Sequence, residues 1–80
     1  MPAITSKYYV SRESWLVDET LASADLRRAY GVNVLGIQRG DKRITSPRPE
    51  EIIHDGDVLY VVGEESAVAG LERVPARQTA

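Results

Sequence analysis

The sequence contains no cysteine and only one histidine among its 80 residues. Without a thiol it forms no disulfide and offers neither a thiolate nucleophile nor a sulfur ligand for a metal. The single histidine, His54, has no second histidine or cysteine with which to share a metal ion. Neither a P-loop nor a GxGxxG phosphate-binding motif is present. We therefore expect no enzyme, no catalytic residue, no metal site and no cofactor.

Charge of one sign and long apolar runs are also lacking. Ten basic and twelve acidic residues give a net charge of −2, and the two signs are interspersed along the chain rather than grouped in blocks. This balance argues against nucleic acid as a partner. The longest apolar run, residues 58–62 (VLYVV), is far shorter than the roughly 20 residues that span a bilayer. We expect a soluble chain, which leaves open that it is attached to a membrane protein.

A chain of 80 residues forms one domain at most. We expect the ordered domain to cover residues 7–74, with flexible tails at residues 1–6 and 75–80, because those ends have no hydrophobic periodicity. A small core without disulfides is often completed by dimerisation. The composition therefore favours a homodimer.

Residues 7–12 (KYYVSR) are rich in aromatic and β-branched side chains and predict a first strand. Residues 32–39 and 58–62 carry apolar side chains on both alternating faces, which predicts the two central strands of a sheet. Gly40-Asp41 suits a type II′ turn that leads into a short strand at residues 42–45.

Residues 20–31 (TLASADLRRAYG) predict a helix, with Thr20 as its N-cap and Gly31 just after its last turn. Two apolar stripes lie on nearly opposite sides of it, one containing Leu21 and the other Leu26. Either the helix breaks near residues 23–25, with Asp25 capping a second short helix, or it is buried on two sides, against its own sheet and a partner. The two explanations are compatible.

The rest of the chain completes a small layered domain. Pro47 and Pro49 end the strand before them, and residues 50–53 are expected to form one helical turn. Asp55-Gly56 reverses the chain. A last helix is expected at residues 64–74, facing inward through Val68, Leu71 and Val74. The order β-α-β-β-β-α gives an α+β fold, a mostly antiparallel sheet with helices packed on it.

Five pieces of the chain together carry a resemblance to a known family. They are Thr20-Leu21, Leu26-Arg27, residues 30–39 (YGVNVLGIQR), Pro47 with Pro49, and residues 55–63 (DGDVLYVVG). In these pieces and their spacing the chain resembles the C-terminal domain of regulators of potassium conductance, the TrkA-C type, over about residues 8–74. Asp18 departs from the pattern, because the family commonly has a glycine there, and this puts the local turn in doubt more than the fold.

The resemblance implies a β-α-β-β-β-α domain that pairs with a second copy. Such domains are fused to, or assembled with, potassium channels and other ion transporters, and they sense ligands on the cytosolic side. Some members bind cyclic di-AMP between two copies. The resemblance thus implies a cytoplasmic location at the inner face of the membrane and a transmembrane transporter or channel as partner.

The candidate ligand-binding residues are Asn33, Arg39, Ile44, Pro47 and His54. The Asn33 amide suits an adenine edge or a ribose hydroxyl, or else it bonds its own backbone at the exit from a turn. Ile44 and Pro47, together with Leu26 and Val34, either provide an apolar floor for a base or pack in the core or the dimer interface. His54 is either a turn residue at the surface or a ligand contact.

Arg27, Arg28 and Arg39 either neutralise phosphates or are solvated surface arginines. For the dimer interface we expect Leu26, Ala29, Tyr30 and Val34. Two functions remain open from the sequence: a dimeric ligand-sensing domain of a potassium or other cation transport system, and a purely structural dimerisation module that binds no small molecule. They differ in whether Asn33, Arg39, Ile44 and His54 converge on an open cleft between subunits.

Overall fold

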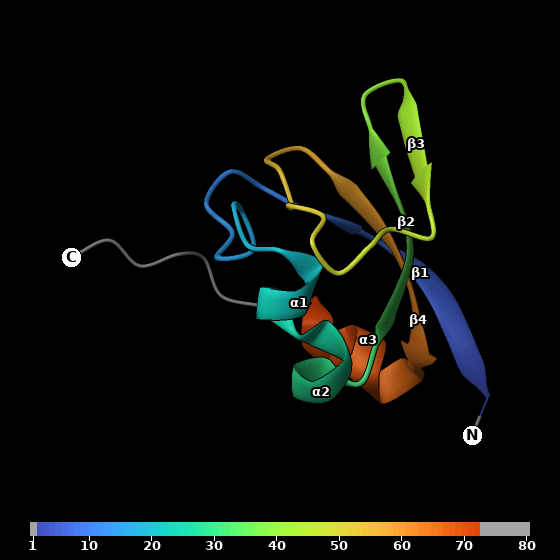
Figure 1. The fold of residues 1–80 in the computed structure, drawn as a ribbon. Helices are drawn as coiled ribbons and strands as arrows, with labels where there is room; N and C mark the ends of the chain where they lie inside the picture. The colour runs from blue at the N-terminus through green and yellow to red at the C-terminus, as the bar shows by residue number, and fades with distance from the viewer. Residues whose placement is uncertain (1, 73–80) are drawn as a thin grey trace.

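The computed structural model describes residues 2–72 and contains a four-stranded sheet with three short helices (Figure 1). In chain order the elements are β1 (Ala3–Tyr9), α1 (Leu21–Ala24), α2 (Leu26–Tyr30), β2 (Asn33–Arg39), β3 (Lys42–Thr45), β4 (Val58–Glu64) and α3 (Glu65–Leu71). Apart from the division of the first helix, this is the expected β-α-β-β-β-α order. The expected α+β fold is confirmed.

The strand order in the sheet is β1-β4-β2-β3, and every neighbouring pair is antiparallel. The two strands that are apolar on both faces, β2 and β4, therefore lie at the centre, as their pattern predicts. A β-bulge interrupts the β2–β4 register between Val34 and Gly36. β3 pairs only with Gly36 to Arg39, so the first half of β2 has no strand on that side.

The core lies between one face of the sheet and the helices. Ile37, Leu59 and Val61 come from the central strands and are at most 1% exposed. Val68 and Leu71 of α3 are buried against them, as their helical spacing predicts. Figure 1 shows all three helices gathered on one side of the sheet. The other face of the sheet carries no helix among the described residues.

The first helix breaks at Asp25, as one of the two alternatives predicts. Thr20 caps α1 by accepting a hydrogen bond from Ser23 N at 2.9 Å. Asp25 then adopts a left-handed backbone (φ 50°), and α2 begins at the next residue. Asp25 occupies the N-cap position of α2, as that alternative expects, but its carboxylate makes no cap hydrogen bond and lies 3.8 Å from Arg28 Nε.

Three turns use the left-handed region that the sequence suggests. Gly31 (φ 78°), Gly40 (φ 58°) and Gly56 (φ 86°) end α2, open the β2–β3 hairpin and reverse the chain before β4. Asp18 also has a positive φ, 73°. This is the position where the family commonly has glycine, so the turn keeps a conformation that glycine favours although the residue differs.

Several expected boundaries are wrong. The first strand runs from Ala3 to Tyr9 instead of residues 7–12, so residues 3–6 belong to the sheet rather than to a tail. Residues 50–53 form no helical turn; a turn at Pro49 and Glu50 leads into extended backbone, where Ile52 bridges Thr20. The last helix ends at Leu71. Val74 and the expected tail at residues 75–80 lie outside the described residues.

Candidate functional site

The five candidate ligand residues do not converge within one chain. Asn33 lines a hollow beside α1 and β2, and Ile44 lines a second hollow where β2, β3 and β4 meet. Arg39 and His54 line a third, next to the loop before β4. Pro47 is half-buried and lines none of these three. A cleft that unites them is absent from the described part of a single copy.

Arg39 is occupied by its own chain. Its Nε and Nη2 donate to the two oxygens of Asp57, each at 2.9 Å, and Asp57 has a fully buried side chain. Nη2 also donates to the carbonyl oxygen of Ile52 at 2.9 Å, and Nη1 to Glu51 at 3.2 Å. Paired carboxylate bonds of this kind are strong and geometrically specific. We call this set of contacts the Arg39 clamp.

The Arg39 clamp fastens the end of β2 to the loop that precedes β4. The hydrogen bond with Asp57, supported by the negative charges of Asp57 and Glu51, raises the pKa of Arg39 above its ordinary value, although burial acts in the opposite direction. The His54 main-chain N–H donates to the same buried carboxylate at 2.9 Å, whereas the His54 side chain is exposed. Arg39 therefore has a structural role in this chain.

The hollow that contains Asn33 combines apolar walls with two polar groups. It has a volume of about 300 Å³. Its lining, which we call the α1–β2 hollow, consists of Leu21, Ala22, Leu26, Arg27, Val32, Asn33, Val34 and Pro49. Arg27 brings a cation and Asn33 an amide, and both residues are exposed. A pocket with a few polar groups above apolar walls is the usual form of a small-molecule site.

A ladder of main-chain hydrogen bonds brings Pro49 to this hollow. Ala22 N donates to the carbonyl of Pro49 at 2.9 Å, and Leu21 N donates to that of Glu51 at 3.0 Å. These are the N–H groups that a helix start leaves without intrahelical partners. The loop thus completes the start of α1, and the Arg39 clamp holds the same loop from its other side.

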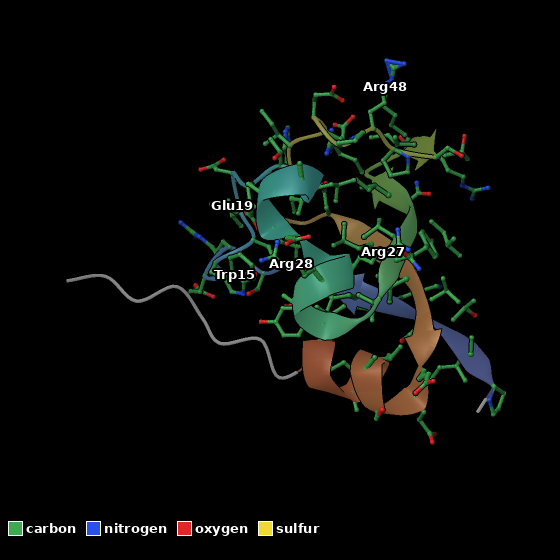
Figure 2. All side chains as sticks on the ribbon, turned by 60° about the horizontal axis from the view of Figure 1, so that its bottom comes forward. Trp15, Glu19, Arg27, Arg28 and Arg48 are labelled. Carbon is green, nitrogen blue, oxygen red and sulfur yellow. The ribbon has the colours of Figure 1, made fainter. Side chains whose placement is uncertain are left out.

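The two neighbouring arginines of α2 have different surroundings. Figure 2 shows Arg27 and Arg28 pointing to opposite sides of the helix, with Arg28 on the side of Trp15 and Glu19. Arg28 lies near Asp25, whereas the ion pairs of the described residues do not include Arg27. Of these two arginines, only Arg27 lines the hollow. Its charge is therefore available to an anionic ligand.

The residues expected at a dimer interface are spread over different environments. Leu26 is 3% exposed and belongs to the core of its own chain, which leaves it little surface for a partner. Tyr30 and Val34 are half-buried and pack against that core, and Ala29 is exposed. Leu26 and Val34 nevertheless both line the α1–β2 hollow.

Sequence reasoning missed Leu21, Ala22 and Pro49 as lining residues. Pro49 was assigned only the role of ending a strand, and its place in the hollow depends on contacts with α1, far away in the sequence. The turn at Pro49 carries no local signal for that contact. Arg27 was considered as a phosphate ligand, and its position at the hollow fits that chemistry.

The α1–β2 hollow offers groups that are suited to binding a ligand. Within residues 2–72, no three histidine or acidic side chains are grouped so that they could hold a metal ion. No helix in this part of the chain is long and apolar enough to cross a membrane. The arrangement offers apolar contact, one hydrogen-bonding amide and one positive charge, which together suit an anionic ligand with a flat ring.

Comparison with known proteins gives a consistent result. The family model of the TrkA-C domain matches residues 7–75. The Ktr system potassium uptake protein C of Bacillus subtilis is 38% identical over 60 residues, which are 75% of this chain and 27% of that protein. Potassium channel protein 1 of Methanocaldococcus jannaschii is 32% identical over 65 residues, 81% of this chain and 20% of that protein. The chain thus spans about a quarter or less of the length of these two relatives.

Solved structures share the fold. The C domain of the potassium transport protein KtrA regulator of conductance, in complex with cyclic di-AMP, superposes with a TM-score of 0.81 at 24% identity, over 89% of this chain and 81% of that one. The RCK_C domain dimer of S. agalactiae BusR, also in complex with cyclic di-AMP, has a TM-score of 0.79 at 25% identity, over 85% of this chain and 90% of that one.

Proposed function

This chain belongs to the TrkA-C domain family, and from that premise we propose that it is the cytosolic ligand-sensing domain of a potassium or other cation transport system. We propose further that its ligand is cyclic di-AMP, bound by the α1–β2 hollows of two copies. The observation that carries this proposal is the pairing of Arg27 and Asn33 above apolar walls. The cyclic di-AMP complexes of two structurally similar domains support it.

The chemistry of the hollow matches one half of this ligand. Leu21, Val34 and Pro49 offer apolar surface for the face of an adenine ring. The Asn33 amide both donates and accepts, so it complements the adenine edge, which carries one donor and one acceptor. Arg27 supplies a guanidinium to the phosphate, the pairing for which its geometry is best suited.

The size of the hollow and the symmetry of the ligand favour a dimer. Its volume of about 300 Å³ is at the lower end of the range for ligand pockets, roughly 300–1,000 Å³. Cyclic di-AMP consists of two identical halves, so a two-fold pair of chains presents the same hollow to each half. Two hollows facing each other then enclose a ligand that one hollow holds only in part.

Regulation follows from the position of the ligand between the copies. A ligand that contacts both chains favours the relative orientation that it fits best, and its differential affinity for two orientations is the source of the shift. A transporter or channel attached to the domains would respond to that change. The Ala29 and Tyr30 end of α2 belongs to the interface in this proposal.

Calorimetric titration of the chain with cyclic di-AMP, with sedimentation to measure its oligomeric state, tests the proposal. We expect one nucleotide per dimer, with affinity reduced roughly 10- to 100-fold in Arg27→Ala, because a hydrogen bond to a charged group contributes about 1.5–3 kcal/mol. Asn33→Ala should also weaken binding. Arg28→Ala is the matched control, because it removes the same charge from the other side of α2.

Two results would contradict the proposal. A folded dimer that gives no heat with cyclic di-AMP would exclude this ligand and favour the structural dimerisation module. Equal losses of affinity in Arg27→Ala and Arg28→Ala would show that general positive charge, and not the α1–β2 hollow, attracts the nucleotide.

A further inference from the structure

The face of the sheet opposite the helices has an unusual composition for a solvated surface. The register places two rows of outward side chains side by side across all four strands. One row is Lys7, Tyr60, Gly36 and Thr45, and the next is Tyr9, Val58, Gln38 and Arg43. We call this surface the outer face.

The central strand β4 is apolar on both of its faces, although within residues 2–72 helices cover only one. Leu59 and Val61 point into the core, whereas Val58, Tyr60 and Val62 alternate with them and are half-buried on the outer face. An antiparallel sheet with one face in water normally shows polar residues at every second position. Tyr9, which lies beside Val58 on this face, is 68% exposed. The strand pattern therefore matches a sheet that is covered on both sides.

A hollow of about 370 Å³ lies on the outer face where β2, β3 and β4 meet. It is lined by Gly36, Tyr60, Arg43 and Thr45, among others, and by Leu35, which is 52% exposed. Gly36 contributes no side chain to its row, and the β-bulge lies next to it. Bulges and strand glycines are frequent where another group approaches a sheet closely. The hollow provides room for one large apolar side chain.

The charges of the two rows are all positive, although the whole chain has a net charge of −2. Lys7 lies over the ring of Tyr60 at 5.9 Å from its centroid, and Arg43 Nε donates to Gln38 at 3.3 Å. The acidic residue in outward register is Glu64, at the last position of β4. The surface thus selects a partner that carries carboxylates.

We propose that the outer face is the docking surface for an acidic amphipathic helix of another protein. The strands that carry Lys7 and Arg43, β1 and β3, lie three strand spacings apart, about 14 Å at about 4.8 Å per spacing, so a helix about 10 Å wide fits on the face between them once Lys7 turns from the Tyr60 ring to a carboxylate of the helix. The apolar side chains of this helix cover Tyr60 and enter the hollow at Gly36. The carboxylates on its two sides bind Lys7 and Arg43. This proposal is independent of the nucleotide and of the α1–β2 hollow.

The charges distinguish this occupant from two others. A second copy of the chain on the outer face would bring Lys7 and Arg43 against their own counterparts, with Glu64 at the edge as the acidic partner, so like charges would oppose it. A membrane surface is recognised by clusters of about four to eight basic residues, and the two rows hold two. An acidic protein segment satisfies the cations and covers the apolar surface together.

NMR titration of the chain with two synthetic helices of about 18 residues tests the proposal. Both helices carry the same leucine stripe, and one has glutamate where the other has lysine. We expect the Leu/Glu helix to shift the amide signals of Tyr9, Val58 and Tyr60 while those of α3 stay unchanged. Affinity should fall about tenfold in Arg43→Glu and in Lys7→Glu, the effect of losing one favourable charge contact.

Lys42→Glu is the matched control, because Lys42 precedes Arg43 in β3 and the strand alternation turns it to the other face. It should leave the affinity unchanged. The double variant Lys7→Glu/Arg43→Glu should exchange preference and bind the Leu/Lys helix. Circular dichroism confirms that each variant is folded, and Lys7→Glu alone suffices if Arg43→Glu unfolds.

Four results would overturn the proposal. These are no binding of the Leu/Glu helix, equal binding of the two helices, an equal loss in Lys42→Glu, and signal changes confined to the helices. Dissociation of a dimer by Lys7→Glu in sedimentation would assign the outer face to a second copy instead. Binding to phosphatidylserine vesicles that Arg43→Glu abolishes would assign it to a lipid surface.

Discussion

Replacing Arg39 by methionine should destabilise the domain strongly, and far more than the same replacement of the exposed Arg28. Methionine keeps much of the apolar stem but removes the guanidinium that donates two 2.9 Å hydrogen bonds to Asp57. The Asp57 side chain is fully buried, so water does not replace the lost donors. Of the hydrogen bonds to this carboxylate, the one from the main-chain N–H of His54 then remains.

The size of the effect follows from that orphaned charge. Removing one partner of a buried ion pair costs about 3–5 kcal/mol. A domain of 80 residues is stable by roughly 4–12 kcal/mol, at about 0.05–0.15 kcal/mol per residue. Because 1 kcal/mol lowers the Tm of a domain of this size by about 4–8 °C, the Tm of Arg39→Met should fall by roughly 12 °C or more.

Thermal and urea denaturation of the variant measure this loss, and Arg28→Met is the control. The Arg28 side chain is 87% exposed and lies 3.8 Å from Asp25, so its removal should change stability little. The double variant Arg39→Met/Asp57→Asn should be more stable than Arg39→Met, because the neutral amide removes the unpaired charge.

The pH dependence has a definite sign. The pKa of Arg39 is raised in the folded state, chiefly by its hydrogen bond with Asp57, so its contribution is complete at every pH below its ordinary pKa and is lost only in strongly alkaline solution. Titration of Arg39 should therefore cause no difference between the free energy of unfolding of the domain at pH 6 and that at pH 9. A loss below about 1 kcal/mol in Arg39→Met, or a double variant less stable than the single one, would refute the reasoning.

Two further predictions concern backbone positions. A methyl group on Gly63 would lie 3.0 Å from the Gly31 carbonyl oxygen, so Gly63→Ala should lower the free energy of unfolding by about 1–3 kcal/mol. A methyl group on Gly70 in α3 would meet nothing within 4 Å, so Gly70→Ala should raise the free energy of unfolding by about 0.5–1 kcal/mol. Urea denaturation checks both, and equal effects would contradict the contact argument. Asp18→Gly should raise the Tm by a few degrees, because glycine adopts the φ of 73° without the roughly 1–2 kcal/mol that a side chain costs there. The greater conformational entropy of glycine in the unfolded chain offsets part of this gain. An unchanged or lower Tm would show that the turn is not strained.

Local patterns predicted the fold because most of its elements are specified by neighbouring residues. The apolar residues on both faces of β2 and β4 predicted that these strands lie at the centre of the sheet. Gly40 and Gly56 predicted turns, because both turns need the positive φ that glycine adopts without strain. The first strand was placed too late, because Ala3 to Ser6 lack a strong hydrophobic pattern and gain their strand conformation from pairing with β4.

The candidate site was predicted only in part. Asn33 was named as a ligand-binding candidate and Arg27 was considered for a phosphate, because both have side chains whose chemistry is recognisable in the sequence, and both line the α1–β2 hollow. Arg39 has the same chemistry as Arg27, yet its donors bind Asp57, Glu51 and the Ile52 carbonyl. Residue type alone cannot separate a ligand arginine from one whose hydrogen bonds are already made.

The sequence by itself thus determined the order of the elements and the family, since these depend on periodicity and turn residues that are close in the chain. For the first helix it left two explanations open, and the structure shows the break at Asp25. The tertiary structure decided which side chains share a hollow. Pro49 reaches α1 through main-chain hydrogen bonds, and Arg39 reaches Asp57 across the loop between them. Such contacts join distant residues whose partners are fixed only when the sheet and its loops pack together, because no local rule selects one buried partner over another.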